Sequence, residues 1–263
     1  MISVWVAGAL AASLAHAPLL STADQRPGPV VAQSPAPVAP APATTAEPNP
    51  FRNLLTNLGT DAKALATSTD SAWILGLGGA GALIMHQRDD DLHSWVLKQP
   101  VDSSVASFGS VLGDGFTQGG LAVAVWGIGR ASSHRRVEHT GSDLIRAQVL
   151  NGVITQAIKF GAGRERPSGG SHSFPSGHTS ATFATAAVIH ANYGIAAGLP
   201  AYAVGTFVGW SRIRGNHHWL SDAIFGAAVG LASGRAASHK HNTPWSIVPV
   251  KTSGGAALYL IRR

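Results

Sequence analysis

Along most of the chain, hydrophobic residues recur at the spacing of amphipathic helices. The segment 142–161 shows this pattern clearly, because Arg146, Gln148, Asn151 and Gln156 fall at intervals that leave one polar face. Uncharged runs elsewhere are interrupted by glycine, proline or polar residues, and they fall short of the ~20 apolar residues that a membrane span needs. The sequence therefore predicts an all-α helical bundle, with helices over residues 53–66, 71–85, 89–99, 101–112, 116–130, 142–161, 177–193, 197–211 and 219–237.

The N-terminal part of the chain breaks the helical pattern. Residues 2–20 are apolar and uncharged, and small side chains follow, which is typical of an export signal cut after Ala23. No Lys or Arg precedes the apolar stretch, so an uncleaved anchor is the alternative and a cytosolic tail a further one. Nine of the chain's 15 prolines lie between Pro18 and Pro50. Residues 24–50 are therefore predicted to form a semi-rigid, disordered Pro/Ala-rich tether.

The C-terminal end also departs from the helical pattern. Two short apolar runs flank Ser253, Gly254 and Gly255, which predicts a small β-hairpin. The expected organisation is thus a signal peptide or anchor, the tether, and one helical domain over residues 51–263.

Composition favours an anionic partner. Charged residues make up only 12% of the chain, yet its net charge is +6 and its pI is about 10.2. Such a balance favours phosphate compounds, anionic lipid heads or nucleic acid, although extra arginines can also serve solubility alone. The basic residues do not form a stripe with aromatic residues, so nucleic acid is not expected. The absence of cysteine excludes disulfides, thiolate catalysis and zinc–thiolate sites.

A first candidate cluster carries a nucleophile. Ser211-Arg212 is followed after five residues by His218 and after three more by Asp222. On a helix beginning near Asn216, His218 and Asp222 would share one face, and the carboxylate would fix the tautomer of the imidazole. His217 would point elsewhere, and Arg212 would reach the same pocket from a loop. An ordinary His–Asp surface pair is the alternative.

A second cluster offers two cations. Lys159 ends a predicted helix, and Arg166-Pro167 follows a glycine-containing turn, so together they could hold a tetrahedral anion. A solvated basic loop is the alternative interpretation. Arg164 and Arg214 are assigned no role.

The third cluster is Pro175-Ser176-Gly177-His178. Ser176 is a natural cap for a helix from about Gly177, and the glycine lets a backbone N–H approach an anion closely. His178 could then protonate a leaving alkoxide. A plain capped helix is the alternative.

Two other site chemistries fit the residues less well. Phe174 stands where a serine-hydrolase elbow needs glycine. A metal site built from His217, His218 and Asp222 is disfavoured, because adjacent histidines rarely point the same way on a helix. No metal is therefore expected.

The three clusters, in this order and spacing, resemble the type 2 phosphatidic acid phosphatase superfamily, which includes bacterial acid phosphatases and vanadium haloperoxidases. The pattern K-x6-R-P, P-S-G-H, S-R-x5-H-x3-D is complete here, within residues 142–237. The resemblance implies a mainly helical bundle with the site between helix ends. It also implies that His218 attacks phosphorus, that Asp222 orients it and that His178 protonates the leaving group. Phosphoryl oxygens would be held by Lys159, Arg166, Arg212, Ser176 and the Gly177 amide.

The sequence thus predicts an exported, periplasmic or envelope phosphatase, soluble or peripheral rather than integral, that hydrolyses phosphate monoesters, lipid phosphates or pyrophosphates through a phosphohistidine. No cofactor is expected, and vanadate would act as an inhibitor. A haloperoxidase with vanadate as its cofactor, and a non-catalytic module that binds phosphate or lipid heads, are the alternatives. The expected partners are a phosphorylated small molecule or lipid and a membrane surface.

Overall fold

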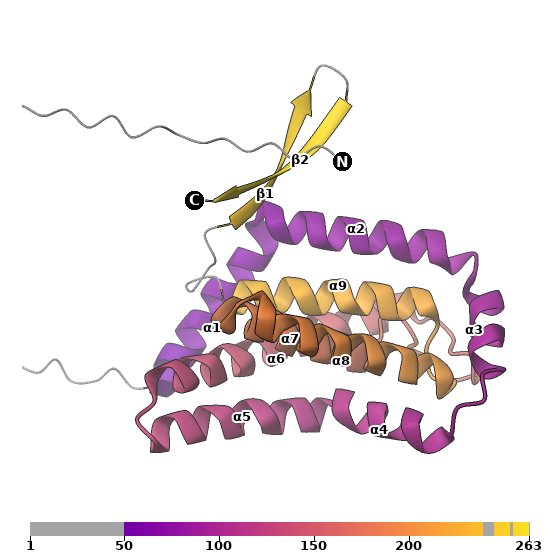
Figure 1. Ribbon diagram of the computed structural model, residues 1–263, viewed down its shortest axis with the longest axis horizontal. Helices are drawn as coiled ribbons and strands as arrows, with labels where there is room; N and C mark the ends of the chain where they lie inside the picture. The colour runs from indigo at the N-terminus through magenta and orange to yellow at the C-terminus, as the bar shows by residue number, and fades with distance from the viewer. Residues whose placement is uncertain (1–49, 239–244, 253–254, 263) are drawn as a thin grey trace, which may run out of the picture. The chain divides into compact units, whose positions relative to one another are not determined.

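The computed structural model describes residues 50–238, 245–252 and 255–262. Residues 1–49, with the predicted export signal and nearly all of the tether, lie outside them. The described residues form a helical bundle and a short hairpin, which confirms the predicted all-α fold class (Figure 1). The helices are α1 (Pro50–Thr67), α2 (Thr69–His86), α3 (Asp89–Leu97), α4 (Ser103–Gly113), α5 (Gly115–Ala131), α6 (Arg135–Ala162), α7 (Gly177–Tyr193), α8 (Ile195–Arg214) and α9 (Leu220–Ala237).

Several helices are longer than predicted, and α6 and α8 differ the most. α6 begins seven residues early, at Arg135 rather than at residue 142, and Glu138 supplies the acidic first turn that a helix N-terminus favours. α8 continues through Pro200 to Arg214, because a proline near the helix start removes a single backbone hydrogen bond. None of the helices in the described part of the chain combines the length and the apolar character that crossing a membrane requires.

The predicted C-terminal hairpin is present. β1 (Trp245–Thr252) pairs antiparallel with β2 (Gly255–Arg262), with Trp245 opposite Arg262 and Thr252 opposite Gly255.

Helix α7 is the centre of the bundle and lies against α6, α8 and α9 (Figure 1). Glycines of α9 allow its backbone to come very close to the backbone of α7 and of the residue before it. A Cβ atom at Gly226 would lie 2.6 Å from the Ser176 carbonyl oxygen, and one at Gly230 would lie 2.1 Å from the Ser180 carbonyl oxygen. Any larger side chain on this face would force α9 away from α7, so the two helices hold the segments before α7 and α9 close together.

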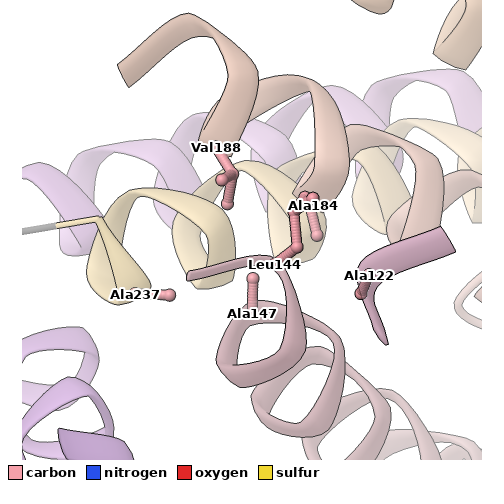
Figure 2. Packing of buried hydrophobic residues seen from close by; sticks show 6 residues of the cluster. All are labelled: Ala122, Leu144, Ala147, Ala184, Val188 and Ala237. Atoms are coloured by element: carbon pink, nitrogen blue, oxygen red, sulfur yellow. The ribbon is translucent and has the colours of Figure 1, made fainter. Parts of the chain in front are cut away.

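The hydrophobic core is built from small side chains. Figure 2 shows a cluster in which Leu144 and Val188 are the largest members, with alanines from α5, α6, α7 and α9 around them. Small residues let the helix backbones come close, and dense packing of this kind keeps the helix ends in fixed positions.

Candidate active site

All three predicted clusters meet at one cavity of about 430 Å³. Its walls come from α6, α7, α8 and the segments that join them. The predicted residues that line it are Lys159, Arg166, Gly177, His178, Arg212 and His218.

Lys159 lies in the last turn of α6, which ends where Gly163 adopts a left-handed conformation (φ 56°). Its ammonium group donates to the carbonyl oxygens of His172 at 2.7 Å and Ser173 at 3.4 Å. Burial, with a smaller contribution from Arg166, lowers the pKa of Lys159 to about 8. A third ammonium proton remains for a ligand.

Arg166 lies on the connection between α6 and α7. Its backbone N–H donates to the Gly170 carbonyl oxygen at 2.6 Å, and its Nε donates to the Ser171 carbonyl oxygen at 3.1 Å. These bonds close a tight turn with Gly169 at φ 89° and leave both terminal nitrogens of Arg166 for a ligand. The turn therefore aims the planar end of the guanidinium at the cavity.

Arg212 lies in the last turn of α8, not in the predicted loop. The helix continues past it because the reversal comes later, at Gly215 and at Asn216, which has a positive φ of 62°. The side chain is buried, and Nη1 donates to the Ser110 hydroxyl at 2.6 Å. Burial, then the charge of Arg166, lowers the pKa of Arg212 to about 10.

His218 lies before α9, which begins at Leu220, so the prediction that His218 and Asp222 share a helix is wrong. The reversal at Asn216 delays the helix, and the His218 N–H donates to the Arg212 carbonyl oxygen at 3.3 Å. The two side chains still meet, with Nδ1 of His218 3.6 Å from Oδ2 of Asp222. That distance makes the contact electrostatic rather than a good hydrogen bond.

The environment keeps His218 neutral. Burial lowers its pKa to about 4, against the opposing effect of Asp222, and the charge of Lys159 adds to the lowering. Since Nδ1 faces Asp222, Nε2 is the nitrogen left for the cavity. His217 is not among the lining residues.

His178 follows Gly177 in the first turn of α7 and lines the same cavity. Burial lowers its pKa to about 4, and the charge of Arg212 and then His218 add to the effect. A Cβ atom on Gly113 of α4 would lie only 2.9 Å from that of His178, so the glycine lets α4 pack against the imidazole.

Ser176 differs from its predicted role. α7 does begin at Gly177, but the Ser176 side chain makes no cap hydrogen bond and does not line the cavity. It is fully buried, its Oγ accepts from the Thr179 hydroxyl at 2.9 Å, and its N–H donates to the Asp222 carbonyl oxygen at 3.0 Å. The close approach of α9 explains this, because Gly226 packs against the Ser176 backbone. Gly177, in contrast, lines the cavity.

Sequence analysis missed Arg164, which binds the carboxylate of Asp222, the residue in contact with His218. Its Nη1 donates to Oδ1 of Asp222 at 2.6 Å and to the Ser221 hydroxyl at 2.7 Å. Its Nη2 donates to Oδ2 of Asp89, on α3, at 2.8 Å. The position of Arg164 between Lys159 and Arg166, inside the second cluster, was its only signal in the sequence, because its carboxylate partners lie far from it along the chain.

Asp222 is ionised as a result of its surroundings. Burial alone would raise its pKa, but the contact with His218, the hydrogen bonds from the Ser173 hydroxyl and the Trp219 N–H, and the charge of Arg164 lower it. The ionised carboxylate can therefore orient the His218 ring and stabilise the positive charge that the ring gains when it forms a bond.

Other residues that line the cavity were not assigned to the site by sequence analysis. They are Gly115, Gln148, Asn151, Gly152, Thr155, Gln156 and Ala181. The polar face predicted over residues 142–161 was a signal for those on α6.

Comparisons with known proteins find similar sequences and structures. Residues 141–246 match the model of the PAP2 superfamily. A lipid A 1-phosphatase of Porphyromonas gingivalis is 41% identical over 97 residues, which is 35% of this chain and 22% of that protein. The match thus spans about a fifth of the relative's length.

Two crystal structures are also similar. LpxE of Aquifex aeolicus aligns with a TM-score of 0.48 and 20% identity, over 57% of this chain and 93% of that one. A transmembrane PAP2-type phosphatidylglycerolphosphate phosphatase of Bacillus subtilis aligns with a TM-score of 0.46 and 18% identity, over 73% of this chain and 94% of that one. The complete set of three clusters and the family match both identify residues 141–246 as similar to the PAP2 superfamily.

Proposed function

We propose that this protein is a phosphatase that cleaves a lipid phosphate or a related phosphate ester through a phosphohistidine on His218. The observation that carries the proposal is the convergence of three cations and two neutral imidazoles on one cavity. Lys159, Arg166 and Arg212 would hold the non-bridging oxygens and stabilise the charge spread over them during transfer.

The first step forms a bond between Nε2 of His218 and phosphorus while the ester P–O bond breaks. The leaving oxygen takes the electron pair and a proton from His178. Because the pKa of His178 is about 4, the proton must enter with the substrate monoanion, whose bound charge raises the pKa of the imidazole. In the second step water attacks phosphorus, His178 takes the water proton, and phosphate leaves with His218 restored.

The surroundings of the cavity support a lipid substrate. Phe116 is 93% exposed beside the lining residue Gly115, and Val153 and Phe160 are 66% and 74% exposed on α6. Exposed apolar side chains that are next in sequence to the lining residues Gly115, Gly152 and Lys159 suit contact with acyl chains or a membrane surface. The likeness to a lipid A 1-phosphatase supports the same class of substrate. We therefore also propose that the protein works at a membrane surface of the cell envelope.

Replacing His218 tests the mechanism. His218→Ala should abolish hydrolysis of p-nitrophenyl phosphate and of detergent-dispersed lipid phosphates, because no other group takes its place as nucleophile. The wild-type protein mixed with radiolabelled substrate and quenched in alkali should carry label that acid releases, as a phosphoramidate does. Full activity of His218→Ala would refute the assignment. Tight phosphate binding by the wild-type protein without turnover of any ester would favour a binding module instead.

A further inference from the structure

One face of α3 lies against the end of α8 and the start of α9 (Figure 1). Asp89, His93 and Val96 are spaced by four and three residues, so they follow one face of this helix. Asp89 accepts a hydrogen bond from the backbone N–H of Ser221, in the first turn of α9. The His93 ring lies edge-on to the Trp219 ring, with the ring centres 5.3 Å apart. The first two residues of this face therefore contact the start of α9.

Val96 forms the apolar end of the same face. It is buried and packs in one cluster with Ile213 and Ala223. Ile213 directly follows Arg212, and Ala223 directly follows Asp222. The cluster therefore joins α3 to the two segments that carry a phosphate-binding arginine and the partner of the nucleophile.

Asp89 forms the polar end of the face, and its side chain is only 4% exposed. Its Oδ1 accepts from the Ser221 N–H at 3.0 Å. Its Oδ2 accepts from the Ser221 hydroxyl at 2.5 Å and from Nη2 of Arg164 at 2.8 Å. The N–H groups in the first turn of a helix have no partner within that helix, and Trp219, the N-cap residue of α9, has no side-chain oxygen to accept from them. Asp89 thus caps α9 from a different helix.

Arg164 connects Asp89 with the carboxylate that faces the nucleophile. Nη1 of Arg164 donates to Oδ1 of Asp222, whereas Oδ2 is the oxygen that faces Nδ1 of His218. Since Oδ2 already accepts a backbone hydrogen bond, the bond at Oδ1 prevents the carboxylate from rotating. His86 also lies 3.0 Å from Nη2 of Arg164, but its side chain is 63% exposed. The buried Asp89 is therefore the stronger anchor for the guanidinium.

We infer that α3 positions the nucleophile, with Asp89 as the positioning residue that acts on His218 through Arg164 and the first turn of α9. The inference rests on the proposed hydrolysis. It adds to the site a helix that lies outside residues 141–246, the segment that matches the family model. Without the carboxylate of Asp89, Arg164 loses a buried partner and the first turn of α9 loses an acceptor, so Asp222 is held less firmly on both sides.

Asp89→Asn tests the inference with a side chain of nearly the same size. Its amide oxygen can still accept from the Ser221 N–H, but its NH2 group then faces Arg164 and cannot accept. With p-nitrophenyl phosphate, kcat should fall about tenfold, because a hydrogen bond between two charged groups is lost. KM should change little, since Asp89 does not line the cavity.

Asp61→Asn is the matched control. The Asp61 side chain is buried to nearly the same degree as that of Asp89, and its Oδ2 lies 3.0 Å from Nε of Arg146, away from the cavity. This variant should lose stability and keep the wild-type kcat per folded molecule. An equal fall of kcat per folded molecule in Asp61→Asn and Asp89→Asn would overturn the inference.

A double variant shows whether Asp89 acts through Arg164. Because Asn keeps the cap on α9, Asp89→Asn combined with Arg164→Met should be no slower than Arg164→Met alone, since no guanidinium is left to anchor. Losses that multiply in the double variant would contradict the inference. Should Asp89→Asn fail to fold, Ser221→Ala carries the same comparison, because it removes the hydroxyl that joins Asp89 to Arg164.

NMR of the histidine rings separates this inference from the proposed hydrolysis. In protein labelled with ¹⁵N-histidine, comparison with His218→Ala identifies the His218 signals. The wild-type ring should show a single tautomer with its proton on Nδ1, the nitrogen that faces Asp222. Asp89→Asn should give a mixture of tautomers, and Asp61→Asn should give the wild-type signals. That result would support the inference even if no ester were hydrolysed, and identical His218 signals in Asp89→Asn and the wild-type protein would refute it even in an active phosphatase.

Discussion

Two arginines of this protein, the buried Arg146 and the half-buried Arg164, have similar partners and different neighbours. Arg146 is paired with Asp61 at 3.0 Å and with Asp143 at 2.5 Å, and it also donates to the Ala237 carbonyl oxygen at the end of α9. Arg164 is paired with Asp89 at 2.8 Å and with Asp222 at 2.6 Å, near the beginning of α9. Each arginine thus joins two carboxylates and fixes one end of the same helix.

The difference between them lies in what each carboxylate touches. Neither Arg146 nor its two aspartates line the catalytic cavity, and the side chain of Arg146 is only 4% exposed. Arg164 is 20% exposed, and its partner Asp222 lies against His218. The comparison teaches that the same arrangement of charges serves stability where it is closed, and contacts the proposed nucleophile where it adjoins the cavity.

Replacing each arginine by methionine should break the two arrangements in different ways, and this is the largest expected effect. Arg146→Met removes the cation that contacts two buried carboxylates, which should cost about 3–5 kcal/mol of unfolding free energy. Arg164→Met should cost less stability, because water reaches that site. It should lower kcat about 100-fold with a smaller change in KM, since a disordered Asp222 no longer orients His218.

Denaturant unfolding and steady-state kinetics on the same two proteins check this prediction. Arg164→Lys is the control variant, because it keeps the charge and should recover part of kcat. A large loss of kcat per folded molecule in Arg146→Met, or none in Arg164→Met, would contradict the distinction between the two regions.

The contrast between the arginines also shows where sequence analysis was sufficient. The helical bundle followed from amphipathic spacing, and the motif spacing identified Lys159, Arg166, His178, Arg212 and His218, all of which line one cavity. Spacing cannot reveal that Arg164 meets Asp89, because 75 residues separate them and only the packing of α3 on α9 brings them together.

Local backbone geometry limited the prediction in a second way. The positive φ of Asn216 delays the start of α9 to Leu220, and no hydrophobic pattern signals that reversal. The site nevertheless forms, since the partner of His218 is fixed by tertiary contacts of Asp222 and not by helical spacing. Asn151 was recognised only as part of a polar face, because the walls of the cavity come together only in the folded protein.

The pH dependence of activity should distinguish the role of Arg164 from that of Arg146. His218 must be neutral to attack, and its pKa is about 4, so kcat/KM of the wild-type protein should fall below about pH 4. Arg164 balances part of the negative charge of Asp222. Removing it makes the potential at His218 more negative, which raises the pKa of the imidazole and moves the acid limit to higher pH. Arg146→Met should keep the wild-type limit, because its aspartates do not touch His218.

Profiles of kcat/KM for n-hexyl phosphate between pH 3 and pH 8 in the three proteins measure these limits. An identical acid limit in Arg164→Met and Arg146→Met would mean that Arg164 does not act on the nucleophile through Asp222.

The smallest expected effect concerns two serines near Asp222 and shows how far the catalytic region extends. The Ser173 hydroxyl donates to Oδ2 of Asp222, the same oxygen that faces His218, whereas the Ser176 hydroxyl accepts from Thr179 and does not line the cavity. Ser173→Ala should therefore lower kcat about two- to tenfold, the contribution of one hydrogen bond, and Ser176→Ala should lower it less. Both side chains are fully buried and the substitutions remove the same atom, so a difference in kcat reflects the partner of each hydroxyl. A larger loss in Ser176→Ala would instead support the role in holding phosphoryl oxygens that the family resemblance implies, and would require the Ser176 side chain to turn toward the cavity when substrate binds.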